Sequence, residues 1–257
     1  MNLKEMFDIS GKVALVTGGG RGIGKVIAEI YGEAGAKVVI TGRRAQWLDP
    51  TEAEFKAKGY ECSSIVADVT QLSEVERTVQ TTLERYGQID ILVNNAGQSW
   101  GAPTEDMPLD KFQQVMDVNL TGIFMLSQLV GRHMIERGQG GRIINIASVK
   151  GLLTMTPEVH SSIGYDTSKG ALITFTRSLA REWGRKGILV NAIAPGWFPT
   201  RMAAGTIEAN LERFEEMAAL GRVGDLEELK GTALFLAAPA SKYITGQVIV
   251  VDGGTVI

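Results

Sequence analysis

The chain has 257 residues, a length that suits one large α/β domain or two small ones. Hydrophobic residues make up 44% of it, enough for a substantial core, and the formal net charge of −3 with scattered lysines and arginines argues against nucleic-acid binding. The single cysteine, Cys62, excludes an internal disulfide and a cysteine-based zinc cluster, and the two isolated histidines, His133 and His160, do not suggest a metal site.

The first residues, 1–6, are mixed polar and lack the apolar core of a signal peptide. No apolar run reaches the ~18 residues that span a bilayer. We therefore expect a soluble, cytoplasmic protein that does not bind membranes.

Short apolar runs alternate with helical segments along the chain. The predicted strands are 12–17, 37–41, 64–67, 89–93, 142–146, 188–193 and 247–251. The predicted helices are 22–34, 45–58, 71–86, 110–137 and 164–184. Apolar strands separated by helices are typical of a parallel sheet covered on both faces. Since no linker or repeat divides the chain, we predict one α/β domain over 1–257, a doubly wound parallel sheet of seven strands with helices on both faces.

Residues 197–224 leave this rhythm and are predicted to form a lid or substrate lobe. Apolar residues recur there three or four positions apart, which favours a helix with one apolar face: Ile207, Leu211, Phe214, Met217 and Leu220. That face either closes over an apolar substrate or packs onto the domain.

The segment 120–130 is apolar on almost every side. Such a helix is buried on more than one face, and the sheet covers only one of them. The second cover is either a neighbouring helix or another subunit, and we predict a subunit.

A glycine-rich turn follows the first predicted strand, with Gly18, Gly22 and Gly24 spaced Gly-x-x-x-Gly-x-Gly. Glycines let the backbone approach a phosphate closely, and the start of a helix offers free amide donors. The strict Gly-x-Gly-x-x-Gly fingerprint is absent, and a tight connection without a ligand would have the same composition. The position after the first strand favours a dinucleotide cradle.

Tyr165 and Lys169 stand four places apart and therefore share one face of a predicted helix. A phenol ordinarily titrates near pH ~10, and a nearby cation favours phenolate and lowers that pKa. A phenol with a lowered pKa suits general acid–base chemistry. Such a pair taken alone is more often ordinary helix surface.

Several motifs in order give the chain its resemblance to a known family. They are Thr-Gly-x-x-x-Gly-x-Gly at 17–24, Asn-Asn-Ala-Gly at 94–97, Ser148 after the fifth strand and Tyr-x-x-x-Lys at 165–169. Together with Asp68-Val69, Asn119, Pro195-Gly196 and Asp252-Gly253-Gly254, they resemble the short-chain dehydrogenase/reductase family over nearly the whole chain. The resemblance implies a Rossmann-type fold, an NAD(P)-dependent oxidoreductase that interconverts a ketone and a secondary alcohol, and a homotetramer.

The resemblance also implies roles for four side chains. Tyr165 donates a proton to the carbonyl oxygen, and Lys169 lowers the pKa of that phenol and binds the nicotinamide ribose. Ser148 hydrogen-bonds the substrate oxygen, and Asn119 keeps a helix locally open and holds a relay water. Read without the motifs, Ser148 could simply cap a turn and Asn119 could be an ordinary polar residue of a helix.

The implied cofactor contacts are Gly18, Arg21, Gly22, Ile23, Gly24, Arg43, Asp68, Val69, Asn95, Ala96, Gly97, Tyr165, Lys169, Pro195, Gly196 and Thr200. Asp68 is expected to hold the adenine ring. Asn94 and Gly97 are expected to line the cleft, and Thr200 to bond the carboxamide.

The end of the second strand bears on the choice between NAD and NADP. An acidic residue there would bond the ribose 2′-hydroxyl, but this chain has Gly42 followed by Arg43. Arg21 and Arg43 can pair with a 2′-phosphate through charge-assisted hydrogen bonds. We therefore predict NADP(H), with NAD(H) as the other option. Solvated surface arginines are the alternative interpretation.

Three functions are compatible with these motifs. The first, which we predict, is an NADPH-dependent reductase of 3-oxoacyl or related ketones. The alternative is a sugar-acid or polyol dehydrogenase, such as a gluconate 5-dehydrogenase, that uses NAD(P). The third is a nucleotide sensor without chemistry, which the retained Ser148, Tyr165 and Lys169 disfavour. Ser148 and Tyr165 are seventeen positions apart, more than is typical of the family, so the substrate cannot be copied from relatives. His160 in this interval is interpreted as a polar loop residue.

Overall fold

The computed structural model describes residues 2–154 and 161–257. Seven parallel strands form one sheet in the order β3-β2-β1-β4-β5-β6-β7. They are β1 (Val13–Thr17), β2 (Lys37–Gly42), β3 (Cys62–Val66), β4 (Ile91–Asn94), β5 (Gly141–Ile146), β6 (Ile188–Pro195) and β7 (Val248–Val251). The order reverses direction between β1 and β4, which confirms the predicted doubly wound, Rossmann-type sheet.

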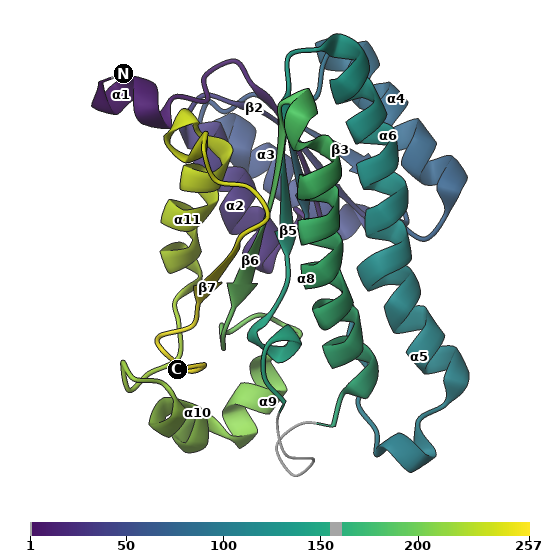
Figure 1. The fold of residues 1–257 in the computed structure, drawn as a ribbon, viewed down its shortest axis with the longest axis vertical. Helices are drawn as coiled ribbons and strands as arrows, with labels where there is room; N and C mark the ends of the chain where they lie inside the picture. Colours follow the sequence, from purple (N-terminus) through teal and green to yellow (C-terminus); the bar gives the residue numbers. More distant parts are fainter. Residues whose placement is uncertain (1, 155–160) are drawn as a thin grey trace.

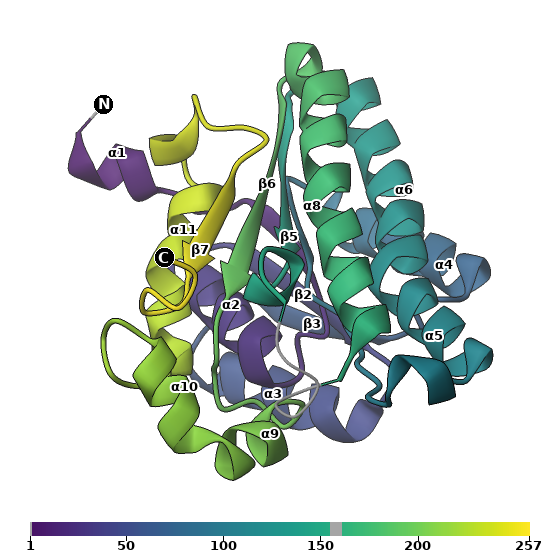
Figure 2. The same ribbon diagram turned by 60° about the horizontal axis from the view of Figure 1, so that its bottom comes forward.

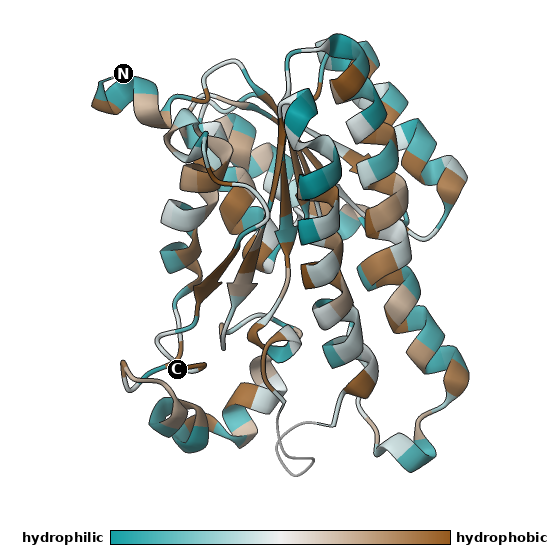
Figure 3. Cartoon of the chain, in the orientation of Figure 1, coloured by the Kyte–Doolittle hydropathy of each residue, from teal (hydrophilic) through white to brown (hydrophobic). Residues whose placement is uncertain are grey.

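Helices cover both faces of the sheet (Figure 1). On one face lie α2 (Gly22–Glu33), α3 (Ala45–Ala57) and α11 (Leu229–Ala237), and on the other lie α4 (Leu72–Tyr86), α5 (Leu109–Met116), α6 (Gly122–Arg137) and α8 (Ile163–Trp183). Figure 3 shows apolar strands at the centre and hydrophilic patches on the outer sides of the helices. Each face therefore buries its own apolar layer against the sheet.

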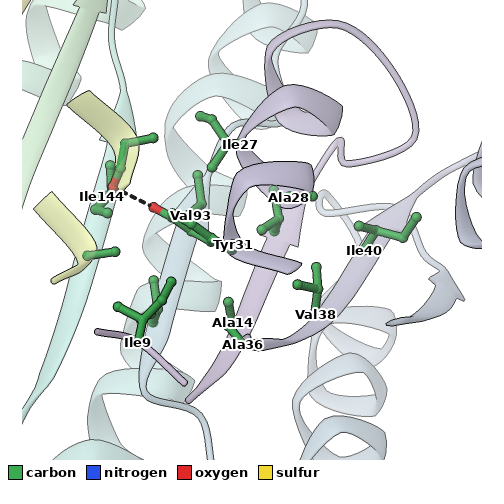
Figure 4. Close-up of a cluster of buried hydrophobic side chains, with 14 of the residues drawn as sticks. Ile9, Ala14, Ile27, Ala28, Tyr31, Ala36, Val38, Ile40, Val93 and Ile144 are labelled. Carbon is green, nitrogen blue, oxygen red and sulfur yellow. Dashed lines mark hydrogen bonds between the residues drawn. The ribbon is translucent and has the colours of Figure 1, made fainter. Parts of the chain in front are cut away.

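A buried tyrosine lies in the apolar layer between the sheet and the helices α2 and α11. Tyr31 is fully buried, and its hydroxyl donates to the Ala233 carbonyl at 3.0 Å, the bond drawn in Figure 4. Ile27, Val93 and Ile144 belong to the same cluster. A buried phenol is tolerated because its one donor has a partner.

Four expectations from the sequence need correction. The third strand begins at Cys62 rather than 64, because Cys62 and Ser63 pair with Val38 and Val39 of β2. The helix predicted over 110–137 is interrupted by a π-helical turn, η2 (Asp117–Thr121). The helix α11 was not predicted. The apolar helix expected in the lobe is instead two short helices, α9 (Ala204–Ala209) and α10 (Leu211–Met217).

These two lobe helices lie beyond the carboxyl ends of β6 and β7 (Figure 2). Phe214 stacks on Trp197 with ring centroids 3.8 Å apart, and Ile207 is buried in the same small cluster. Leu211 and Leu220 are exposed. These apolar residues thus pack largely on one another within 197–224, and whether the lobe closes over a substrate stays a prediction.

The remaining short segments connect the main elements. They are α1 (Leu3–Phe7), η1 (Thr104–Asp106), η3 (Val149–Gly151), η4 (Gly184–Lys186), η5 (Leu226–Glu228) and η6 (Pro239–Ser241). Within the described ranges, every helix is too short or too polar to cross a bilayer.

Candidate active site

A cleft of about 740 Å³ opens at the carboxyl ends of the strands. Its walls come from the turn after β1, the ends of β2, β4 and β5, the helix α8 and the start of the lobe. It brings together most of the predicted site residues: Gly18, Arg21, Gly22, Ile23, Arg43, Asp68, Val69, Asn95, Ala96, Gly97, Ser148, Tyr165, Lys169, Pro195, Gly196 and Thr200. Sheets of this topology bind ligands at this edge.

The glycine turn has the backbone conformation that only glycine adopts readily. Gly18 and Gly22 have φ angles of +66° and +55°. No side chain among the described residues caps the N-terminus of α2. The first amides of that helix therefore remain as donors toward the cleft, which is the arrangement that binds a phosphate.

The turn is tied to the end of β4. The Thr17 hydroxyl accepts from the backbone N–H groups of Asn95 and Ala96, both at 2.9 Å, and Asn95 Nδ2 donates to the Thr17 carbonyl at 2.8 Å. These bonds hold the turn and the Asn-Asn-Ala-Gly segment at a fixed separation. Both walls of the cleft near the phosphate position are thereby rigid.

Three predicted site residues, Gly24, Asn94 and Asn119, do not line the cleft. Gly24 is buried behind the turn, where an added Cβ would stand 2.4 Å from Asn95 Nδ2, so its absent side chain serves packing rather than ligand contact. Asn94 is 1% exposed, and its Nδ2 donates to Ser127 Oγ and Asn145 Oδ1 at 3.0 and 2.8 Å. The Nδ2 group thus links β4, β5 and α6.

The residues expected at the adenosine side follow β2 and β3. One oxygen of Asp68 accepts from the N–H and hydroxyl of Thr70 at 2.9 and 2.8 Å, and the other lies 3.9 Å from the Arg43 guanidinium. Asp68 is therefore both a turn residue and a cleft residue. The two interpretations made from the sequence are both compatible with this geometry.

Three further residues at this end escaped the sequence reasoning. Trp47, in α3, has the guanidinium of Arg21 at 4.9 Å and that of Arg201 at 5.6 Å from its ring centroid. Arg44 lines the same wall. Burial, and then the charges of Arg201 and Arg44, lower the pKa of Arg21. Three mutually repelling cations therefore face one region of the cleft, which suits an anion.

The sequence around Trp47 and Arg201 indicates a role in the cleft only weakly. Arg201 is only one residue beyond Thr200, and Trp47 precedes Pro50 in a segment of mixed polarity. Their contact joins residues far apart in the sequence, so no local pattern reports it.

At the other end of the cleft lie the polar groups expected to act on the substrate. Ser148 follows β5, and its Oγ accepts from the Lys150 N–H at 3.2 Å, which also makes it the cap of η3. Tyr165 lies in the first turn of α8. Burial raises the pKa of the Tyr165 phenol, while its hydrogen bond with Ser148 opposes that rise.

The pKa of the Tyr165 phenol is raised in this structure, opposite to the direction expected, and the effect of Lys169 on that phenol stays a prediction. Lys169 Nζ lies 5.5 Å from the centroid of the Tyr165 ring and donates to the Ile146 carbonyl at 2.7 Å. Burial lowers the pKa of Lys169 itself to about 8. Burial therefore disfavours the charged form of Lys169, and it is also the largest cause of the raised pKa of Tyr165.

Asn119 sits in the π-helical turn, fully buried, so the expected local opening of the helix is present. Its Oδ1 accepts from the Gln98 N–H at 2.8 Å, and its Nδ2 donates to the Gln98 carbonyl and to Ser168 Oγ, both at 2.9 Å. Asn119 therefore joins the β4 loop to α8 next to Lys169. The relay water stays a prediction.

The far wall is set by the turn after β6. The Gly196 N–H donates to the Val251 carbonyl at 2.9 Å, and a Cβ at this position would lie 2.7 Å from Asp252 Cβ. Thr200 lies opposite Gly22, with its Cγ2 3.7 Å from where a Cβ would stand. The lobe thus approaches the glycine turn across the cleft.

We find no candidate metal site among the described histidines and acidic residues. Across residues 2–154 and 161–257, no three His, Cys, Asp or Glu side chains gather as a metal site would require. His133 accepts from the Ile89 N–H at 3.3 Å, and His160 lies outside the described residues.

Comparisons with known proteins agree with this geometry. A family model described as Enoyl-(Acyl carrier protein) reductase matches residues 18–256. Gluconate 5-dehydrogenase of Gluconobacter oxydans is 39% identical over 259 residues, covering 100% of this chain and 99% of the relative. The rhamnolipid biosynthesis 3-oxoacyl-[acyl-carrier-protein] reductase of Pseudomonas aeruginosa is 41% identical, covering 96% of this chain and 97% of the relative.

Two solved structures are similar to this chain over nearly its whole length. A gluconate 5-dehydrogenase from Burkholderia cenocepacia in complex with NADP and tartrate has a TM-score of 0.93 at 37% identity, covering 99% of this chain and 98% of that one. A Pseudomonas aeruginosa RhlG/NADP active-site complex has a TM-score of 0.91 at 38% identity and covers 100% of both chains.

Proposed function

Since the chain belongs to the short-chain dehydrogenase/reductase family and is an NAD(P)-dependent oxidoreductase, we propose that it reduces a ketone to a secondary alcohol with NADPH. The proposed substrate is a 3-oxoacyl compound or a related carbonyl. The observation that carries this proposal is that Ser148, Tyr165 and Lys169 line the same cleft as the glycine turn.

The proposed mechanism uses Tyr165 as the general acid. Its phenol donates a proton to the substrate oxygen in reduction and takes the proton back in oxidation. The raised pKa of the phenol keeps it protonated at neutral pH, the form that a reduction needs. Ser148 holds the same oxygen by a hydrogen bond and so fixes the carbonyl against the phenol.

The cleft fits a dinucleotide. The uncapped N-terminus of α2 with Gly18 and Gly22 would hold the phosphates, Asp68 the adenine ring, and Lys169 the nicotinamide ribose. When bound, the nicotinamide supplies the hydride. Arg21 and Arg43 support the preference for the 2′-phosphorylated form, as does Gly42 in place of an acid.

Apolar side chains at the lobe side of the cleft support the 3-oxoacyl substrate. Trp197, Phe198 and Met202 line this part of the cleft together with Val149. An acyl chain gains free energy from burial against such a wall, at roughly 25 cal/mol per Å² of apolar area. A polyhydroxylated acid would leave its hydroxyls facing apolar groups there.

A sugar-acid or polyol dehydrogenase using NAD(P) is the second candidate. It is favoured by the full-length similarity to gluconate 5-dehydrogenases and by the tartrate bound in one of them. The cationic residues of the cleft are compatible with an acidic substrate.

One panel of assays tests both candidates. We would measure turnover of 3-oxoacyl esters, diketones and gluconate, each with NADPH or NADP and with NADH or NAD. The proposal expects the highest kcat/KM for a 3-oxoacyl ester with NADPH. Turnover of gluconate with NAD alone would overturn both the substrate and the cofactor.

A variant pair tests the acid. Tyr165→Phe should keep NADPH binding and lose at least ~100-fold in kcat, because proton transfer by a positioned side chain contributes this much. Tyr243→Phe is the matched control, since Tyr243 is 98% exposed. Unchanged turnover in Tyr165→Phe would refute the assignment.

We also propose a cytoplasmic homotetramer of single-domain chains, with 197–224 as the substrate lobe. The outer surface of α6 and α8 supports assembly, because Phe124 is 48% exposed and contacts Phe175 edge-to-face at 6.4 Å. A solution mass of one chain would reject the tetramer.

A further inference from the structure

A buried lysine lies beside the proposed reaction site and has no part in the mechanism above. Lys150 belongs to η3, two residues after Ser148, lines the cleft and is only 5% exposed. Lysine is almost never buried unless its charge is paired. The groups that contact the Lys150 ammonium therefore indicate the role of its charge.

The partners of Lys150 lie on either side of Tyr165 in the sequence. Lys150 Nζ donates to Ser162 Oγ at 2.9 Å and lies 3.2 Å from Asp166 Oδ1. The Ser162 hydroxyl in turn donates to Asp166 Oδ1 at 2.9 Å. Because the three groups form a closed network, the turn that carries Ser148 is fixed to the first turn of α8.

The chain between the two reacting groups does not by itself set the distance between them. Ser148 and Tyr165 are separated by seventeen positions, so their separation is set by the elements that carry them. The short helix η3 packs closely on α8, where a Cβ on Gly151 would lie 2.7 Å from the backbone carbon of Lys169, and the network adds an ion pair in which the Lys150 side chain is 4% exposed.

The same pair controls the charge next to the phenol. The charge of Asp166 favours the neutral phenol and so raises the pKa of Tyr165. Lys150, 3.2 Å from Asp166, offsets that charge, and burial lowers the pKa of Lys150 while Asp166 opposes this. Among the residues that the structure describes, Lys169 also faces the ring, with Nζ 5.5 Å from its centroid.

We propose that Lys150 and Asp166 are positioning residues for the reaction, joining the Ser148 turn to the Tyr165 helix and balancing the charge beside the phenol. This inference rests on the proposed role of Tyr165. A direct contact between Lys150 and a substrate carboxylate is disfavoured, because Asp166 already compensates the ammonium and little of it is exposed.

The test is the pH dependence of kcat/KM for oxidation of the alcohol, in which the phenolate is the base. Asp166→Asn removes the anion, so the profile should move to lower pH. Lys150→Met leaves the anion uncompensated, so its profile should move to higher pH, with kcat/KM at neutral pH reduced about tenfold. The double variant K150M/D166N should return toward the wild-type profile, and Lys150→Arg should recover most of the activity.

A buried ion pair elsewhere supplies the control. Arg137 and Asp90 lie 2.9 Å apart with side chains 12% and 8% exposed, remote from the cleft lining. Arg137→Met should lower the melting temperature without moving the pH profile. If Lys150→Met and Asp166→Asn only lower the melting temperature, as Arg137→Met should, the pair is merely structural and the inference is wrong. The same conclusion follows if both variants move the pH profile in the same direction.

Failure of a variant to fold and failure of the proposed function can both be told apart from failure of this inference. If Lys150→Met does not fold, Asp166→Asn decides alone, and an unmoved profile overturns the inference. Turnover by Tyr165→Phe would refute the proposed function and this inference with it, whereas an inactive Tyr165→Phe with unmoved profiles in the other variants refutes only the inference.

Discussion

Replacing Gly24 by alanine would force a methyl group into the contact between the glycine turn and Asn95. The added Cβ would lie 2.4 Å from Asn95 Nδ2, 2.4 Å from the Gly18 carbonyl oxygen and 2.8 Å from its carbon. Because two of these atoms are backbone, the clash cannot be relieved by turning a flexible side chain. Either the turn moves or Asn95 leaves its place.

The expected cost follows from what Asn95 would lose. Its Nδ2 donates to the carbonyls of Thr17 and Gly18 at 2.8 and 3.3 Å. Overpacking a tight site costs about 1–3 kcal/mol, and each lost hydrogen bond about 1 kcal/mol. Alanine recovers about 1 kcal/mol in helix propensity, so we expect a net loss of at least ~2 kcal/mol.

Thermal unfolding without added cofactor measures this loss, which corresponds to a fall of roughly 4–8 °C in Tm for a chain of this size. Gly231→Ala is the matched control, because Gly231 is an exposed glycine of α11 with no atom within 4 Å of its added Cβ. It should stabilise the protein by about 0.5–1 kcal/mol. A Gly24→Ala variant as stable as Gly231→Ala would refute the reasoning, as would an unchanged KM for NADPH, since the displaced turn carries the phosphate donors.

Two further substitutions test buried polar groups. Because burial lowers the pKa of Lys169 from 10.5 to about 8, Lys169→Met should raise stability by roughly 1–2 kcal/mol below about pH 8 while abolishing turnover. Between about pH 8 and 10.5 the unfolded chain binds more protons than the folded one, so this advantage should shrink as pH rises, and Tm measured against pH checks it; a constant advantage would contradict the cause. Tyr31→Phe leaves the buried Ala233 carbonyl without its donor and should cost about 1–2 kcal/mol in urea unfolding, whereas the exposed control Tyr243→Phe should cost nothing measurable.

The sheet could be predicted from the sequence because its strands are buried on both faces. Runs such as 37–41 and 188–193 are apolar at nearly every position, and the glycines after helices mark where the chain turns. The helix α11 was missed although Leu229, Ala233, Leu236 and Ala237 are buried at helical spacing. Gly231 and the charged residues before it weaken the helical pattern in the sequence. The packing of these side chains against α2 is what identifies the helix.

The site was predictable where local sequence dictates geometry and unpredictable where it depends on distant contacts. The positive φ of Gly22 and the placement of Ser148 at the end of β5 follow from neighbours in the chain. The ion pair of Lys150 with Asp166, and the two arginines at Trp47, join segments that only the fold brings together. The direction of the Tyr165 pKa shift was mistaken because burial depends on the whole cleft.

The π-helical turn at Asp117–Thr121 fits one surplus residue into an otherwise regular helix. Each residue rotates a helix by about 100°, so removing any one residue between Leu109 and Asn119 would give a smoother helix whose amide no longer points at Gln98. The direction of the Asn119 amide therefore depends on the number of residues before it, and single-codon deletions here should be tolerated far less well than substitutions on the outer side of α5.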